Sequence, residues 1–195
     1  DLDMDPEDPS ILYAGMWTFR RTAWDFYSGG TGSSIYKSSD GGKTWKELRK
    51  DLPEGEKGRI SVRVSPADPD RVFTVIEWDS TALYGSKDKG ESWEKLNQSP
   101  TIAERPFYFC LIIPDPLDTS RIYKPGTSVN VSTDGGRLFR TSSFAGGAIH
   151  ADIHDLWIWE KDNRFMYAGT DGGVYVSNDY GSSWRHLRNL PVSQF

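Results

Sequence analysis

The chain has 195 residues, of which 36% are hydrophobic and 13% aromatic, and its net charge is −5 at pH 7. This length suits one ordinary domain with an apolar core, and the scattered charges offer no basic patch for nucleic acid. The longest apolar run, residues 107–113, is far shorter than the roughly 20 residues of a membrane helix, so no membrane span is predicted in this segment.

One short pattern occurs four times along the chain and marks a repeat. It reads Ser-x-Asp-x-Gly-x-x-aromatic and occupies residues 38–45, 86–93, 132–139 and 177–184. Its aspartates are Asp40, Asp88, Asp134 and Asp179. A period near 47 residues, about the size of a four-stranded propeller blade, predicts that each repeat forms one small sheet.

Each repeat is expected to contain four strands, because short runs of β-branched and aromatic residues alternate with turn residues. First strands are expected at residues 2–4, 60–64, 107–113 and 153–159. Second strands follow Pro/Asp-rich turns in segments 5–15, 65–77, 113–126 and 160–169. Third strands are expected at 35–37, 83–85, 129–131 and 174–176, and fourth strands at 45–48, 93–96, 139–140 and 184–187. No segment has sustained helical periodicity, so almost no helix is predicted.

The sequence therefore predicts an all-β chain, a β-propeller segment of four four-stranded blades. The expected blades are residues 1–49, 50–97, 98–140 and 141–188, and residues 189–195 lead into a further blade. Since the pattern continues at both ends, we expect the segment to form part of a larger propeller. Its end faces would then be covered by the remaining blades or by a partner chain.

The four repeats resemble the Asp-box, or BNR, repeat of sialidases, family 74 glycoside hydrolases and sortilin-type (VPS10) receptors. Residues 146–158, 169–184 and 189–195 are similar to bacterial proteins described as sortilin-like or glycosyl-hydrolase-like BNR proteins. This resemblance implies that the repeated turns join strands 3 and 4 on the side away from the ligand. It also implies a periplasmic or extracellular location.

The repeated turns have a structural explanation that needs no catalysis. The aspartate can accept N–H groups of its own turn, the glycine can adopt positive φ, and the aromatic ring can pack between neighbouring sheets. The tryptophans that end three of the copies are Trp45, Trp93 and Trp184, whereas the third copy ends in Phe139. Because chain direction alternates, the connections between strands 2 and 3 lie on the opposite side, where we expect function.

The first candidate site is the long connection at residues 16–34. It contains side chains that favour ligand contact, namely Trp17, Arg20, Arg21 and Trp24. Tryptophan and arginine dominate binding hot spots, and a loop of this length in a compact domain is usually functional or disordered. The alternative is that the loop folds over a neighbouring blade as added core.

The second candidate is the segment His150-Ala151-Asp152-Ile153-His154. Alternation along a strand would place His150, Asp152 and His154 on one face, where they could bind ligand, coordinate a metal, or form a hydrogen-bonded row. The third candidate is Gly169-Thr170-Asp171-Gly172-Gly173, which is similar to the segment that carries a catalytic aspartate in family 74 enzymes, although one residue shorter. Asp-Gly-Gly is also a favoured tight turn.

Two functions are compatible with these features. The first is a sortilin-like recognition or scaffold domain that binds protein or carbohydrate. The second is a family 74-like hydrolase of polysaccharide with Asp152 and Asp171 as acid and base. Residues 19–22 and 104–106 do not match the arginine segment of sialidases, so sialidase activity is not predicted. No cofactor is predicted.

Overall fold

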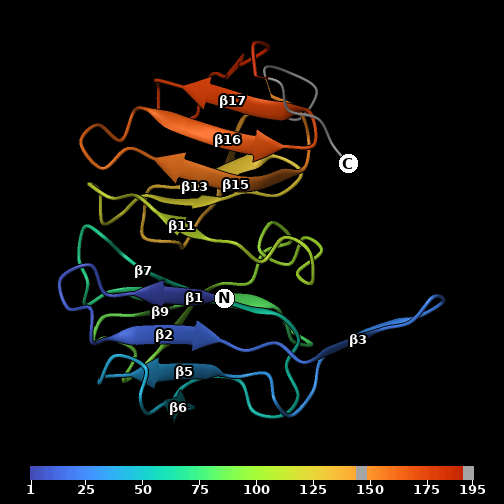
Figure 1. The fold of residues 1–195 in the computed structure, drawn as a ribbon, viewed down its shortest axis with the longest axis vertical. Helices are drawn as coiled ribbons and strands as arrows, with labels where there is room; N and C mark the ends of the chain where they lie inside the picture. Colours follow the sequence, from blue (N-terminus) through green and yellow to red (C-terminus); the bar gives the residue numbers. More distant parts are fainter. Residues whose placement is uncertain (144–148, 191–195) are drawn as a thin grey trace. The chain divides into compact units, whose positions relative to one another are not determined.

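The computed structural model describes residues 1–143 and 149–190, which form strands, turns and loops without any helix. It divides into two compact units, Asp1–Ile112 and Ile113–Phe195. Each unit contains two four-stranded antiparallel sheets, and the first also carries a separate two-stranded hairpin (Figure 1). The all-β prediction is therefore confirmed. No helix among the described residues is long and apolar enough to cross a membrane.

The first unit contains the sheets of the first two repeats. The first sheet has the order β1 (Leu2–Met4), β2 (Leu12–Gly15), β5 (Ile35–Ser38) and β6 (Lys46–Leu48). The second has the order β7 (Ile60–Val64), β8 (Val72–Ile76), β9 (Ala82–Ser86) and β10 (Glu94–Asn97). Buried aliphatic and aromatic residues of both sheets form one core, which includes Tyr13, Ile60 and Trp93.

The second unit repeats this arrangement. Its first sheet has the order β11 (Ile113–Pro114), β12 (Ile122–Lys124), β13 (Val129–Ser132) and β14 (Arg140–Ser143). Its second has the order β15 (Ile153–Ile158), β16 (Met166–Thr170), β17 (Gly173–Ser177) and β18 (Arg185–His186). Tyr123, Ile153 and Trp184 belong to its core. In three of the sheets neighbouring strands follow one another along the chain, and in the first sheet only the separate hairpin of β3 and β4 comes between β2 and β5, as in propeller blades with one long connection.

Two expected strands differ from those observed. The apolar run 107–113 was expected to be a strand, yet only Ile113–Pro114 pairs. Arg105 has a positive φ of 40°, and its carbonyl accepts the N–H groups of Tyr108 and Phe109 over 2.8 Å each. This turn folds the run back before β11 begins. The last strand of the third sheet extends to Ser143, three residues beyond the expected end at 140.

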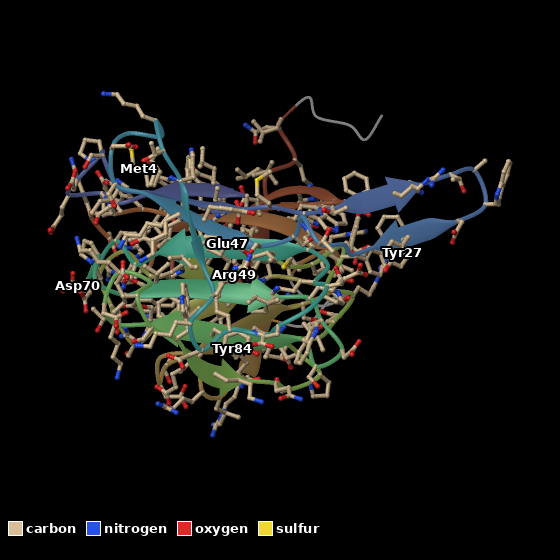
Figure 2. The ribbon with its side chains drawn as sticks, turned by 90° about the horizontal axis from the view of Figure 1, so that it is seen from below. Met4, Tyr27, Glu47, Arg49, Asp70 and Tyr84 are labelled. Atoms are coloured by element: carbon tan, nitrogen blue, oxygen red, sulfur yellow. The ribbon has the colours of Figure 1, made fainter. Side chains whose placement is uncertain are left out.

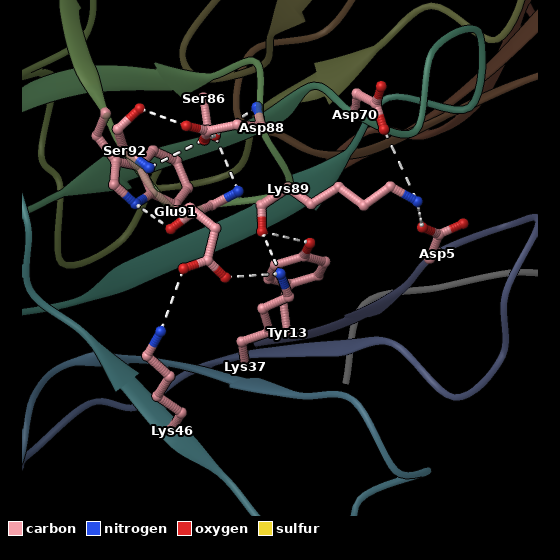
Figure 3. Close-up of polar contacts among 12 residues, drawn as sticks. Asp5, Tyr13, Lys37, Lys46, Asp70, Ser86, Asp88, Lys89, Glu91 and Ser92 are labelled. Carbon is pink, nitrogen blue, oxygen red and sulfur yellow. Dashed lines mark hydrogen bonds and ion pairs between the residues drawn. The ribbon is translucent and has the colours of Figure 1, made fainter.

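The repeated turns, here called the Ser–Asp turns, share one hydrogen-bond pattern. In each, the serine hydroxyl donates to the aspartate Oδ1 over 2.7–2.8 Å and accepts the glycine N–H over 2.8–2.9 Å. The aspartate also accepts the N–H four residues later over 2.9–3.0 Å. Figure 3 shows this arrangement around Asp88, between Ser86 and Ser92. Every aspartate is therefore occupied by its own turn.

Two positions in each Ser–Asp turn adopt the left-handed conformation, where glycine is favoured. The residue after the aspartate has φ of 71° at Gly41, 55° at Lys89, 77° at Gly135 and 61° at Tyr180. The following residue is always glycine. Within each unit, a tyrosine of the preceding sheet donates to the carbonyl of the residue after the aspartate. Tyr13 donates to Lys89 over 2.9 Å, and Tyr123 to Tyr180 over 3.3 Å.

The tryptophans of these turns differ in their surroundings. Trp93 and Trp184 are 6% and 7% exposed and pack in the two cores. Trp45, which belongs to the first sheet, is 40% exposed. The expected packing between neighbouring sheets is therefore observed for Trp93 and Trp184, whereas Trp45 keeps an open face.

Candidate functional site

A two-stranded hairpin lies between β2 and β5 and holds the side chains expected to bind ligand. β3 (Phe19–Arg21) and β4 (Phe26–Ser28) pair antiparallel, and Figure 1 shows them extending away from the first sheet. The Thr22 N–H donates to the Asp25 carbonyl over 2.8 Å, which closes the turn at the tip. Trp24 lies in this turn and is 90% exposed.

Four aromatic side chains gather below the tip and are called here the aromatic cluster: Trp17, Phe19, Phe26 and Phe107. The rings of Trp17 and Phe19 stack with centroids 4.3 Å apart, and those of Phe26 and Phe107 are 5.3 Å apart. Phe19 is 53% exposed, and Phe26 and Phe107 are 36% and 37% exposed. Phe19, Phe26 and Phe107 therefore present an apolar surface to solvent, while Trp17 is half-buried beneath them.

Polar contacts fix the base of the aromatic cluster. The Trp17 indole N–H donates to Ser28 Oγ over 3.0 Å, and Ser28 Oγ donates to Glu77 Oε2 over 2.6 Å. The Arg59 guanidinium lies 5.3 Å from the Trp17 ring centroid. It also donates to the carbonyl of Phe107 over 3.1 Å. Trp17 is therefore an anchor of the hairpin, whereas the side chain of Trp24 is accessible to a ligand.

The two arginines of the hairpin lie on opposite faces. Arg20 pairs in register with Tyr27, and Arg21 pairs with Phe26, so alternation places Arg21 on the face of the cluster. Both arginines are exposed. Tyr27, labelled in Figure 2, donates its hydroxyl to Glu56 Oε2 over 3.0 Å. The cluster face is thus aromatic with one cationic group at its edge.

Phe107 and Arg59 were missed by sequence reasoning. Phe107 belongs to the run that was assigned to a strand, and its role depends on the turn at Arg105. Arg59 precedes β7 with no neighbouring sequence pattern. The signal available in the sequence was that both segments, the hairpin and residues 107–109, are rich in aromatic residues.

A second site is a groove of about 580 Å³ in the second unit, beside the turn that joins β16 to β17. We call it the histidine groove. It is lined by His154, Gly169, Thr170, Asp171, Gly172, Gly173, Val174, His186, Leu187, Arg188 and Leu190. Thr170 and Gly173 pair in register, so Asp171 and Gly172 form a two-residue turn. The expected tight turn at this segment is therefore present.

The carboxylate of Asp171 faces the histidine groove. Asp171 Oδ1 lies 2.7 Å from His154 Nε2, and the side chains are 33% and 43% exposed, respectively. The turn itself is held by the Thr170 hydroxyl, which donates to the Gly173 carbonyl over 3.1 Å and accepts the Gly172 N–H over 3.0 Å. Asp171 is therefore not needed to close its own turn.

All three histidines of the chain lie around this turn. A Cβ added to Gly172 would stand 2.5 Å from His150 Cγ, and one added to Gly173 would stand 3.0 Å from His186 Nε2. The His186 ring stacks on Tyr175 with centroids 4.7 Å apart and an angle of 14° between the planes. The two glycines thus allow the imidazole rings to approach the backbone of the turn.

Comparisons with known proteins place these sites in context. No protein-family model matches the chain. It is 26% identical over 200 residues to a probable oligoxyloglucan-reducing end-specific xyloglucanase of Neosartorya fischeri, an alignment that covers 93% of this chain and 23% of that protein. It is 21% identical over 123 residues to sortilin of Rattus norvegicus, covering 59% of this chain and 14% of that protein. The chain is a relative of xyloglucanases and of sortilin.

A solved structure shares the fold. The GH74 xyloglucanase from Xanthomonas campestris superposes with a TM-score of 0.62 and 20% identity over 95% of this chain and 24% of that protein. The chain thus spans about a quarter of the length of these xyloglucanases.

The predicted pair of Asp152 and Asp171 does not share the groove lining. Asp152 adopts a positive φ of 58°, and β15 begins only at Ile153, with an irregular register between Ile153 and Asp155. The expected alternation that would align His150, Asp152 and His154 on one strand face is therefore wrong. Within residues 1–143 and 149–190, no group of three or more His, Cys, Asp or Glu side chains is arranged to hold a metal.

Proposed function

We propose that this chain is a carbohydrate-recognition segment of a β-propeller, in which the aromatic cluster and Trp24 bind an extended sugar chain. One observation carries the proposal: a hairpin anchored at its base presents open aromatic faces and a 90% exposed tryptophan. The C–H face of a sugar ring packs well on such rings, because both surfaces are apolar and flat.

The relatives support a carbohydrate over a protein ligand. The probable xyloglucanase of Neosartorya fischeri aligns at 26% identity over 93% of the chain, against 21% over 59% for sortilin of Rattus norvegicus. A protein ligand would use the same tryptophan and arginine side chains and stays the alternative. Location outside the cytoplasm and completion of the propeller by further blades or a partner chain are further expectations of this proposal.

The experiment is titration calorimetry of the purified protein with xyloglucan oligosaccharides. Trp24→Ala is expected to weaken binding about tenfold, which corresponds to roughly 1.4 kcal/mol. Phe19→Ala should act in the same direction. The control is Trp157→Ala, which removes a 51% exposed tryptophan outside the cluster and should leave binding unchanged. Equal affinity of Trp24→Ala and wild type would contradict the proposal.

A second candidate function is glycoside hydrolysis. The favouring observation is the partly exposed Asp171 carboxylate beside His154 in the histidine groove. An inverting mechanism requires a second carboxylate at roughly 6.5–9.5 Å, and Asp152 is the predicted partner. Hydrolysis of xyloglucan by wild type, lost in both Asp171→Asn and Asp152→Asn, would establish this activity. Hydrolysis retained in Asp152→Asn would exclude that pair.

A further inference from the structure

The histidine groove combines one cationic group, two imidazole rings, one carboxylate and an apolar wall. Arg188 is exposed and lines the groove, and it makes no ion pair with the residues that the structure describes. Asp171 is already hydrogen-bonded to His154. The groove therefore has a charged group with no protein partner, which points to an anionic ligand.

We propose that the histidine groove binds a sugar that carries a carboxylate, a uronic acid residue. The site is independent of the aromatic cluster, since it is built entirely from residues 154–190. Its volume of about 580 Å³ lies in the range of small-ligand sites, roughly 300–1,000 Å³.

The arrangement of donors and acceptors favours a sugar acid over a simple carboxylate. Arg188 is suited to an anion, because guanidinium groups bind carboxylates through two parallel hydrogen bonds. Asp171 Oδ1 is bonded to His154, which leaves Asp171 Oδ2 to accept a hydroxyl of the ligand, and a simple carboxylate has no hydroxyl to donate. A uronic acid supplies both, since its hydroxyls donate to Asp171 while its carboxylate accepts from Arg188. Val174, Leu187 and Leu190 offer an apolar surface to the ring.

The turn is shaped for close approach of a flat ligand. Gly169, Gly172 and Gly173 line the groove, and the rings of His150 and His186 lie over Gly172 and Gly173, so the open backbone is that of Gly169. A Cβ at Gly169 would meet no atom within 4 Å, which shows open space above that residue. His186 is held in place by stacking on Tyr175, so its ring is oriented before a ligand arrives.

Two further carboxylates are near His154 in the sequence. Asp152 precedes β15 and Asp155 lies on it, and neither belongs to the lining of the groove. Asp155 accepts the Leu156 N–H over 2.9 Å. Asp171 is therefore the one carboxylate among the lining residues that the structure describes.

The test is calorimetry of the purified protein with trigalacturonic acid at neutral pH. The matched ligand is the same trimer with methyl-esterified carboxylates, which lacks the negative charges. We expect the ester to bind at least tenfold more weakly than the acid. Equal affinity for acid and ester would overturn the proposal.

Variants assign the binding to this groove. Arg188→Gln is expected to weaken trigalacturonate binding about tenfold. The control is Arg185→Gln, since Arg185 precedes His186 on β18 and is absent from the lining. Trp24→Ala should leave this binding intact, which separates the result from that of the aromatic cluster. Unchanged affinity in a folded Arg188→Gln variant would also refute the site.

Discussion

Lys89 Nζ lies 2.8 Å from the carboxylate of Asp5, a side chain with no exposed surface, and this ion pair joins the first two sheets (Figure 3). Asp5 also accepts the N–H groups of Glu7 and Asp8 over 2.9 and 3.1 Å. Burial opposes ionisation of Asp5, but the hydrogen bonds from Lys89, Glu7 and Asp8 outweigh it, so the pKa of Asp5 is lowered. The pair therefore couples the sheets most strongly when Asp5 is ionised.

The substitution Asp5→Asn is expected to lower the free energy of unfolding by about 1–3 kcal/mol at neutral pH, because it leaves buried partners poorly satisfied. A carboxyl with a lowered folded-state pKa stabilises above its unfolded pKa, and this contribution disappears as the pH falls through the folded value. The deficit should therefore shrink in acid. Urea denaturation at several pH values measures it. Asp70→Asn is the control, since Asp70 is 66% exposed and 3.8 Å from Lys89. A similar loss in both variants would contradict the role of Asp5.

Substitution of Asp88 tests how much the Ser–Asp turns contribute to the stability of the protein. Hydrogen bonds from Ser86 and then Ser92 lower the pKa of Asp88 to about 2, so its contribution should be present above about pH 4 and be lost as the pH falls toward 2. We expect Asp88→Ala to cost only about 1 kcal/mol at pH 7, because the group is exposed and water replaces part of its hydrogen bonding. Asp79→Ala removes the same charge from an exposed position and should be neutral in thermal denaturation. Equal melting temperatures for the two variants would refute this role.

Gly15 and Gly169 occupy equivalent positions in the sequences Tyr-Ala-Gly of β2 and β16. A Cβ on Gly15 would lie 2.7 Å from the backbone oxygen of Ile60, whereas one on Gly169 would meet nothing within 4 Å. Because backbone cannot yield easily, Gly15→Ala is expected to destabilise the protein by about 1–3 kcal/mol. Gly169→Ala should be neutral. Denaturation curves of the two variants measure both free energies of unfolding. An unchanged free energy of unfolding in Gly15→Ala would contradict the expectation and show that β7 can shift.

The hairpin offers a contrast between two tryptophans. Trp17 is anchored by Ser28 and stacked on Phe19, so Trp17→Ala should cost about 2 kcal/mol, less than the 3–5 kcal/mol typical of fully buried aromatic residues. It should also speed proteolytic cleavage between β3 and β4. Trp24→Ala should change neither stability nor cleavage, since Trp24 is 90% exposed. Identical cleavage of Trp17→Ala and wild type would remove the anchoring role.

The sequence predicted the sheets well because turn chemistry is local. Each Ser–Asp turn is specified by a serine, an aspartate and a glycine within five residues, and so the adjoining strands could be located from the pattern alone. The run 107–113 could not be placed in the same way, because its apolar residues suit either a strand or a buried loop. The positive φ of Arg105 makes the run a loop. Arginine has no preference for that conformation, so the sequence could not predict it.

The candidate sites depended on contacts distant in the chain. The turn at Asp171 was predictable from Asp-Gly-Gly, but its partner His154 is 17 residues away on another strand. Alternation suggested that Asp152 would accompany His154, and the left-handed backbone at Asp152 breaks that alternation. Trp17 and Trp24 looked alike in sequence, since only the folded hairpin separates the anchor from the exposed tip.

The hydrogen bonds from Tyr13 to Lys89 and from Tyr123 to Tyr180 bear on how the sheets lose their structure. Each connects the interior of one sheet to the turn of its neighbour, so when the first sheet unfolds, the turn carbonyl of the neighbouring sheet loses its hydrogen-bond donor. In such repeats, stability resides in nearest-neighbour coupling more than in any single repeat. Within each unit the two sheets should therefore exchange their amide hydrogens as one cooperative block, with β2 and β9 sharing a common opening free energy.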